Sequence, residues 1–199
     1  MRSWTKARST RYASPPRDVA ALLHRIELGW APKYLMFWGH RAKRGNAAGK
    51  HVLSQWWPVD FEIDAVRYRS AEHYMMAEKA RMFADEDAWQ SIRAAPTPGA
   101  AKALGRKVRH FDQATWDAGC FDIVVRGNVA KFGQNEPLRH YLLETGDKVL
   151  VEASPVDRIW GIGLAADDPR AQDPARWRGS NLLGFALMQA RAMLRTDRS

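Results

Sequence analysis

The sequence predicts a mainly helical domain that contains a few short β-strands. Three observations lead to this fold class: apolar residues recur at helical spacing over several long stretches, the other apolar runs are short, and glycine or proline separates them. The chain has 199 residues, of which 46% are hydrophobic and 27% charged, which is ordinary for a globular protein. Because long helices outnumber short strands, we expect a single compact domain that is neither a β-sandwich nor a doubly wound α/β fold.

The N-terminal segment is predicted to be separate from that domain. Residues 1–16 are polar and basic and end in Pro15-Pro16, which indicates a disordered basic tail before a domain over 17–199. Residues 1–17 supply +5 of the formal net charge of +9, so the body of the chain lacks the charge of a protein that coats DNA. An Arg- and Ser-rich transit peptide is the alternative interpretation of this segment.

The first half of the domain mixes helices with short strands. Apolar residues on one face from Val19 to Ile26 predict a helix over 17–28, with Gly29 at its end. The apolar run 33–38 predicts a buried strand, and the alternation on both sides of Asp64-Ala65 predicts a hairpin of 61–63 with 66–68. Further helices are expected from Ser70 to about 82 or 83, over 85–94 with a break at 96–99, over 100–107 and over 113–131.

The second half is expected to end on a long helix. Asn135-Glu136-Pro137 predicts a helix start, with Gly146 at the end of that helix. Apolar runs at 149–151 and 159–162 predict two strands, and 167–178 is expected to form a polar loop. Asn181 is expected to cap the last helix, whose apolar residues Leu183, Leu187, Ala190 and Leu194 recur at helical spacing.

Several functional classes find no support in the sequence. No apolar run approaches the roughly 20 residues that a membrane span needs, and the N-terminus has no apolar core of a secretory signal. The single cysteine, Cys120, cannot form an intrachain disulfide, so a cytoplasmic location is expected. Neither a Rossmann fingerprint nor a phosphate-binding loop occurs, and the histidines lack metal-ligand spacing. We therefore expect no cofactor, no metal and no membrane partner.

The most informative segment is the helix that begins at Ser70, because two opposite charges share its apolar stripe. Glu72, Met76, Lys79 and Phe83 are spaced so that they lie on one helix face. Glu72 and Lys79 are about 10.5 Å apart along the axis, and the long Lys79 side chain leans back toward Glu72. A ligand atom between them would meet both charges. The alternative is structural, with Glu72 favouring the helix dipole and Lys79 extending past an apolar face.

A second candidate lies in the segment from Asp157 to Gly163. Gly161 permits close backbone approach, and the ring of Trp160 can stack on a base, although a tight turn explains the same pattern. Taken individually, the aromatic residues Phe37, Trp38, Trp56 and Trp57 are more typical of a core than of a binding platform.

An ordered series of motifs resembles the NADAR (YbiA-like) family. The series covers about residues 34–195, and its specificity lies in the order and spacing rather than in any one motif. The segments that carry the resemblance are Met36 to His40, Leu53 to Pro58, Tyr68 to Ala80, Leu104 to Arg106, Lys131-Phe132, Thr145-Gly146, Asp157 to Gly163 and Asn181 to Gly184.

The resemblance implies a mainly helical fold and N-glycosidase activity. Some members of the family act on aminopyrimidine ribosyl phosphates of riboflavin synthesis, and others remove ADP-ribose from guanine in nucleic acid. The family's catalytic glutamate matches Glu72, and the Lys79 position is implicated as a possible nucleophile toward ribose C1. The positions expected to bind the substrate are Gly39, Trp56, Arg106, Trp160, Gly161 and Asn181.

The expected reaction leaves some roles open. Glu72 is expected to stabilise an oxocarbenium-like ribose or to activate water. Lys79 either binds phosphate or ribose oxygens as a cation or forms a Schiff base with the opened sugar. Asp157 either orients the ribose hydroxyls or acts as a second carboxylate, and Trp160 is expected to hold the base.

Two further hypotheses concern which ligand the protein binds and whether it cleaves that ligand. One is a module that binds ADP-ribose or a related nucleotide without cleaving it. The other is an enzyme directed at ADP-ribosylated nucleic acid, which the basic tail and the loop residues Arg41, Lys43, Arg44 and Lys50 favour. The sequence does not predict an oligomeric state.

Overall fold

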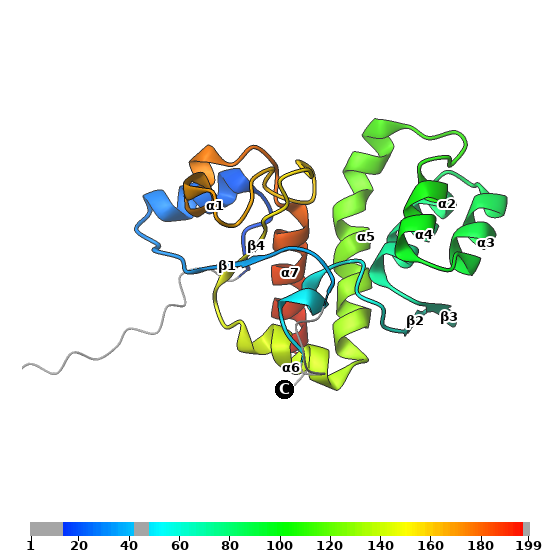
Figure 1. Cartoon of the computed structure of the whole chain (residues 1–199), viewed down its shortest axis with the longest axis horizontal. Coiled ribbons are helices and arrows are strands. Elements are labelled where there is room, and N and C mark those ends of the chain that lie inside the picture. The colour runs from blue at the N-terminus through cyan, green and yellow to red at the C-terminus, as the bar shows by residue number, and fades with distance from the viewer. Residues whose placement is uncertain (1–13, 42–47, 197–199) are drawn as a thin grey trace, which may run out of the picture.

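A long central helix organises the structure (Figure 1). The computed structural model describes residues 14–41 and 48–196, and this part of the chain is mainly helical with short strands, as predicted. The central helix α5 (Gln113–Gly133) packs against α2 (Ala71–Met82) on one side and α7 (Leu182–Thr196) on the other. The remaining helices are α1 (Val19–Glu27), α3 (Glu86–Ala94), α4 (Pro98–Gly105) and α6 (Glu136–Glu144), and the 3-10 turns are η1 (Lys50–Leu53), η2 (Pro169–Gln172) and η3 (Pro174–Arg176).

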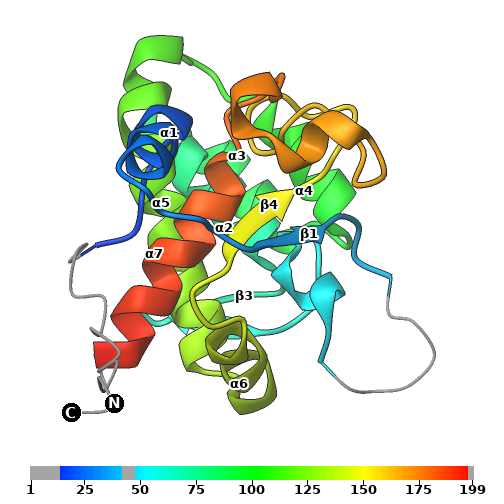
Figure 2. The same cartoon turned by 90° about the vertical axis from the view of Figure 1, so that its left-hand side faces the viewer.

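The strands form two separate pairs. The predicted hairpin is confirmed, since β2 (Phe61–Ile63) pairs antiparallel with β3 (Val66–Tyr68). Strands β1 (Tyr34–Phe37) and β4 (Val149–Glu152) lie side by side and pair in parallel (Figure 2), with Phe37 opposite Glu152. Helix α7 packs against β4, and so it joins this pair to α5.

Two glycines allow α2 to be enclosed by its neighbours. A Cβ on Gly105 of α4 would lie 2.2 Å from the Sδ of Met76, and one on Gly127 of α5 would lie 2.5 Å from a ring carbon of Tyr74. Glycine at these positions therefore lets α4 and α5 approach α2 closely. As a result, the first seven residues of α2 are all buried, including the polar Glu72 and His73.

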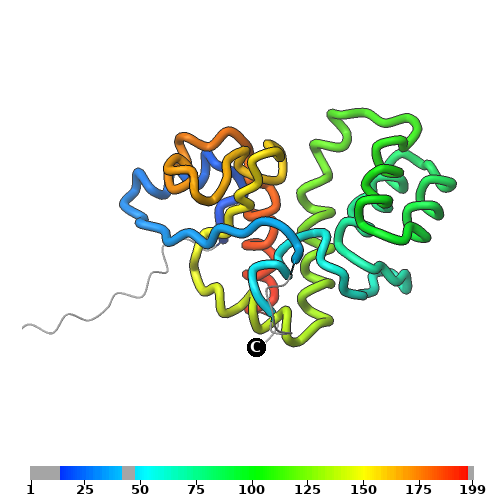
Figure 3. The backbone as a smooth tube through the Cα atoms, viewed as in Figure 1, coloured from blue at the N-terminus to red at the C-terminus, as the bar shows by residue number. Residues whose placement is uncertain are grey.

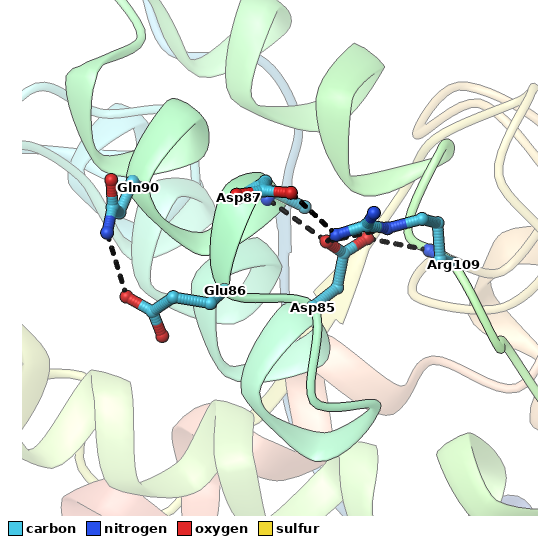
Figure 4. Close-up of polar contacts among 6 residues, drawn as sticks. Asp85, Glu86, Asp87, Gln90 and Arg109 are labelled. Atoms are coloured by element: carbon cyan, nitrogen blue, oxygen red, sulfur yellow. Dashed lines mark hydrogen bonds and ion pairs between the residues drawn. The ribbon is translucent and has the colours of Figure 1, made fainter.

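An ion pair joins the start of α3 to the segment after α4 (Figure 4). The Asp85 carboxylate caps α3 by accepting from the Ala88 N–H at 3.2 Å. It also accepts from the Arg109 guanidinium at 2.6 Å and from the Arg109 backbone N–H at 2.8 Å. These bonds hold the pKa of Asp85 well below its usual value. The contact ties the segment after α4 to the turn between α2 and α3.

The strand predicted at 159–162 is wrong, because this segment follows an irregular path (Figure 3). Its backbone groups bond to several different partners instead of to one neighbouring strand. Ile162 N–H donates to the Glu152 carbonyl, whereas the Gly161 carbonyl accepts from the Asn181 N–H. The polar segment 167–178 contains the short turns η2 and η3.

The structure describes only residues 14–16 of the predicted tail. There the Ser14 carbonyl accepts from Arg25 and the Pro15 carbonyl from Gln189 of α7. Residues 1–13 and the loop cations Lys43 and Arg44 lie outside the described residues. Within the described part, no helix combines the length and the apolar character that crossing a membrane demands.

Candidate active site

Glu72 lies in the first turn of α2, inside the protein. Ser70 caps the helix, as predicted, by accepting from the His73 N–H at 3.3 Å. The Glu72 side chain is 2% exposed, and its Oε1 has no hydrogen-bond partner among the described residues. A glutamate whose only role was to favour the helix dipole would lie at the surface, where water solvates it. The burial therefore favours the functional interpretation of Glu72.

The electrostatic setting of Glu72 is dominated by its burial. Loss of solvent raises the pKa of Glu72 to about 7, with a smaller increase from the charge of Asp157. The charges of Lys102 and Arg106 and a hydrogen bond from the Trp56 side chain act in the opposite direction on this pKa. The carboxyl thus titrates near neutral pH, as a group that exchanges protons with a substrate must.

The segment that carries Trp56 is anchored by two buried polar side chains of α5. The Lys131 Nζ donates to the carbonyls of Val52 and Ser54, both at 2.7 Å. Asn128 donates to the Gln55 side chain at 3.0 Å, and the Gln55 carbonyl accepts from the Glu72 N–H at 3.0 Å. The same network therefore positions Trp56 and the first turn of α2.

A second carboxyl, that of half-buried Glu152, ends strand β4. Its Oε2 is shielded from solvent and has no hydrogen-bond partner among the described residues. Burial raises the pKa of Glu152 to about 8, and the charges of Asp157 and Glu72 add to the increase while Lys102 opposes it. The two glutamates and Asp157 thus belong to one electrostatic cluster.

Asn181 holds the end of β4 in place. Its Oδ1 accepts from the Glu152 N–H at 2.9 Å and its Nδ2 donates to the Leu150 carbonyl at 3.0 Å. Asn181 is fully buried and has a φ of 52°, in the left-handed region that asparagine tolerates. The predicted capping role for its side chain is therefore wrong, because the side chain bonds to the strand.

The Asp157 loop is held by its own carboxylate. Asp157 Oδ1 accepts from the backbone N–H groups of Ile159 and Trp160 at 2.9 and 2.8 Å. A Cβ on Gly161 would lie 2.9 Å from the Glu152 carbonyl oxygen, so this position needs a glycine to approach β4. Trp160, which is half-buried, lies three residues after Asp157 in this loop, and its backbone N–H is held by the Asp157 carboxylate.

Two cations of the α4 segment act on the carboxyls. Lys102 lies in α4 and Arg106 follows its last residue, and Arg106 is exposed. The Lys102 Nζ also lies 5.9 Å from the centroid of the Trp56 ring. Positive charge and an aromatic ring therefore lie beside the buried carboxyls, which suits an anionic ligand with a flat ring.

Exposed aromatic and glycine residues follow β1. Gly39 is exposed with a φ of 76°, which glycine adopts without strain. The His40 and Trp56 rings lie 5.7 Å apart. Trp38 is 60% exposed, so its predicted place in the core is wrong, whereas Phe37 is buried. Because Phe37 pairs with Glu152, this exposed segment begins next to the second carboxyl.

Lys79 has a different setting from Glu72. Its Nζ lies 3.9 Å from the centroid of Phe111 and 5.6 Å from that of Trp116, and partial burial lowers its pKa. None of the contacts described for this chain joins Lys79 to Glu72 or Glu152. The structure thus couples Trp56, Arg106 and Asp157 to the carboxyl of Glu72, whereas the contacts described for Lys79 are with the rings of Phe111 and Trp116.

Two carboxyls shielded from solvent, with cations and aromatic rings beside them, are typical of the active site of a small hydrolase. Residues 36–195 match the model of the NADAR domain family. The chain is 46% identical over 164 residues to N-glycosidase R617 of Acanthamoeba polyphaga mimivirus, which covers 80% of this chain and 95% of that protein. It is 30% identical over 142 residues to N-glycosidase YbiA of Escherichia coli strain K12, covering 71% of this chain and 79% of that one.

The chain therefore belongs to the NADAR domain family. The solved NMR structure of the E. coli protein YbiA has the same fold, with a TM-score of 0.66 at 24% identity, over 85% of this chain and 89% of that chain. Because several relatives are N-glycosidases, the predicted enzyme class, a hydrolase acting on N-glycosyl compounds, is confirmed.

Proposed function

We propose that this enzyme hydrolyses the bond between ribose C1 and a base or amine in a nucleotide-like substrate, with Glu72 as the group that activates water. The observation that carries the proposal is the burial of Glu72 with an unpartnered Oε1 beside Trp56, Lys102 and Arg106. A carboxylate so placed stabilises positive charge that develops on the ribose and accepts the proton of an attacking water. The half-filled hydrogen-bonding capacity of the carboxyl is what a substrate or water would complete.

The substrate is proposed to carry phosphate. Lys102 and Arg106 supply positive charge next to the carboxyls, and Trp56 and Trp160 offer ring surfaces for the base. Aminopyrimidine ribosyl phosphates and ADP-ribose on guanine both combine these features. A cytoplasmic setting fits both substrates and the free buried thiol of Cys120.

We expect Lys102→Met to raise KM for a ribosyl phosphate by about 10- to 100-fold while kcat changes little, because one charge-assisted contact to phosphate is lost. Steady-state kinetics at two salt concentrations measure this effect. Lys107→Met is the matched control, since Lys107 is exposed just past α4 and is not among the charges that act on Glu72 or Glu152. An unchanged KM in Lys102→Met contradicts the phosphate role.

Lys79 stays a proposed catalytic residue with two possible roles. The lowered pKa of its amine suits a nucleophile, whereas the Phe111 and Trp116 rings suit a cation. Borohydride added during turnover separates the roles. A sugar adduct on the Lys79 peptide identifies a Schiff base, and an unmodified peptide together with a raised KM in Lys79→Met identifies a binding cation.

A nucleic-acid substrate is the second candidate, and one cavity favours it. This cavity of about 620 Å³ lies outside the carboxyl cluster and is lined by Pro58, Val59, Asp60, Arg67, Arg69 and Arg93. Pro58 lies two residues after Trp56, and Arg69 lies three residues before Glu72. Three arginines against one aspartate suit the phosphates that flank a modified guanine.

Parallel incubation with two substrates tests the proposed function. One is an aminopyrimidine ribosyl phosphate and the other an oligonucleotide with ADP-ribosyl-guanine, and mass spectrometry reads the released base and sugar. Cleavage of the oligonucleotide with a steep fall in rate as salt rises supports the second candidate. Cleavage of the small substrate alone supports the first. Tight binding of both without cleavage contradicts catalysis and favours a module that only binds nucleotides.

A further inference from the structure

Glu152 is a half-buried acid with one carboxyl oxygen shielded from solvent, and its place in the strand does not explain that shielding. It is the last residue of β4, after three buried aliphatic residues, and its Oε2 is shielded from solvent without a partner. An unpartnered carboxyl in this position costs stability, because burial removes its solvation and no protein donor replaces the water. Such a cost is typical of a group retained for its chemistry.

The backbone of Glu152 is fixed on both sides. Its N–H donates to the Asn181 side chain, its carbonyl accepts from the Ile162 N–H at 2.9 Å, and the strand register places it opposite Phe37. The Glu152 side chain therefore extends from a backbone position that is held rigidly. Rigid placement of this kind is what a group needs if it must meet one atom of a substrate.

Three elements place charged groups around the Glu152 carboxyl. Helix α2 contributes Glu72, the loop after β4 contributes Asp157, and α4 contributes Lys102. Two of these three neighbours are acids, so the setting favours the neutral, protonated form of Glu152. Burial and these charges raise its pKa to about 8. The charges that act on Glu72 are instead two cations, Lys102 and Arg106, and one acid, Asp157, so these charges favour its ionised form. In such a pair the protonated group is the acid and the ionised group is the base.

We propose that Glu152 is a further catalytic residue, the general acid that protonates the leaving base while Glu72 acts as the general base. This assignment rests on the proposed N-glycosidase function. In this assignment the shielded Oε2 of Glu152 serves the departing nitrogen, and the shielded Oε1 of Glu72 serves the attacking water.

The reaction balances with water as the only co-reactant. The electron pair of the C1–N bond leaves with the base nitrogen, which takes the proton of Glu152. The water oxygen bonds to ribose C1, and its proton passes to the Glu72 carboxylate. Turnover leaves Glu152 ionised and Glu72 protonated, and one proton passed from Glu72 to Glu152 restores the starting state.

The test compares leaving groups that differ in their need for a proton. Wild type, Glu152→Gln and Glu72→Gln are assayed on an aminopyrimidine ribosyl phosphate and on 4-nitrophenyl ribosyl phosphate, whose leaving group departs as an anion. We expect Glu152→Gln to lose about 100-fold or more on the first substrate and only a few-fold on the second. Glu72→Gln is expected to lose activity on both. Glu62→Gln, at an exposed glutamate of β2, is the control for the substitution itself.

The pH dependence of the wild-type rate gives a second readout, and it does not depend on whether a variant folds. A rate loss at high pH on the aminopyrimidine substrate, absent on the nitrophenyl substrate, is the signature of a general acid. Equal losses on both substrates in Glu152→Gln, or no loss on either, overturn the role of Glu152 while leaving the N-glycosidase function in place. Wild type that cleaves neither of these substrates nor the oligonucleotide with ADP-ribosyl-guanine overturns the proposed function, and the assignment of Glu152 with it.

Discussion

A Glu72→Gln variant is expected to be more stable than the wild type above pH 7 while its turnover falls by about 100- to 10,000-fold. Burial raises the pKa of Glu72 from 4.5 to about 7, so the folded state holds a proton that the unfolded state lacks between these values. The wild type therefore loses stability as pH rises through this window, by about 3 kcal/mol in total at 1.36 kcal/mol per pKa unit. Glutamine has no charge to bury and avoids this cost.

Urea unfolding at pH 5 and pH 8 measures the effect on stability. The stability gain of Glu72→Gln should be small at pH 5 and largest at pH 8, whereas Glu62→Gln should show no such trend because Glu62 is exposed. A gain that does not change with pH contradicts the burial of an ionised Glu72. A gain that comes with full activity contradicts its role in the reaction.

A Lys131→Met variant is expected to lose about 2–3 kcal/mol more stability at pH 9 than at pH 7, and to lose activity at both. Burial lowers the pKa of Lys131 from 10.5 to about 7. Between these values the unfolded chain holds a proton that the folded chain lacks, so the wild type gains stability as pH rises. Methionine lacks this gain, and it leaves the Val52 and Ser54 carbonyls without their donor at every pH.

Denaturant unfolding at the two pH values measures this difference, and kcat and KM are measured alongside. Activity is expected to fall because Lys131 anchors the segment of Trp56, whose side chain bonds to Glu72. Lys107→Met is the matched control at an exposed position. Equal destabilisation at pH 7 and pH 9 would mean that Lys131 is charged in the fold throughout this range.

Much of the fold follows from local patterns in the sequence. The hairpin, the cap at Ser70 and the last helix rest on alternation, capping and helical spacing, which act within a few residues. The strand predicted at 159–162 fails because its residues form a loop whose backbone partners come from β4 and from residues 178–183. Those contacts are distant in sequence, and no local pattern encodes them.

The residues of the candidate site that belong to a recognisable motif were predictable from the sequence. Those whose importance depends on burial in the folded chain were not. Glu72 interrupts an apolar stripe, and the resemblance to the family singles it out. Glu152 looks like the polar end of a short strand, and Lys131 looks like a helix-end cation, so nothing local indicates that Lys131 is buried or that a Glu152 oxygen is shielded from solvent. The sequence does mark Lys131, because Lys131-Phe132 is one of the family motifs, but the motif alone does not indicate what Lys131 does. Packing of α5 against the Val52 to Trp56 segment supplies that role.

The most direct test of the account is rescue of a Glu72→Ala variant by azide. Removal of the carboxyl leaves space for a small anion that can attack ribose C1 in place of activated water. We predict that the variant releases almost no base by itself, and that azide restores release and gives a ribosyl azide detectable by mass spectrometry. A Glu72→Ala variant that releases base at the wild-type rate without azide would contradict the central role of Glu72.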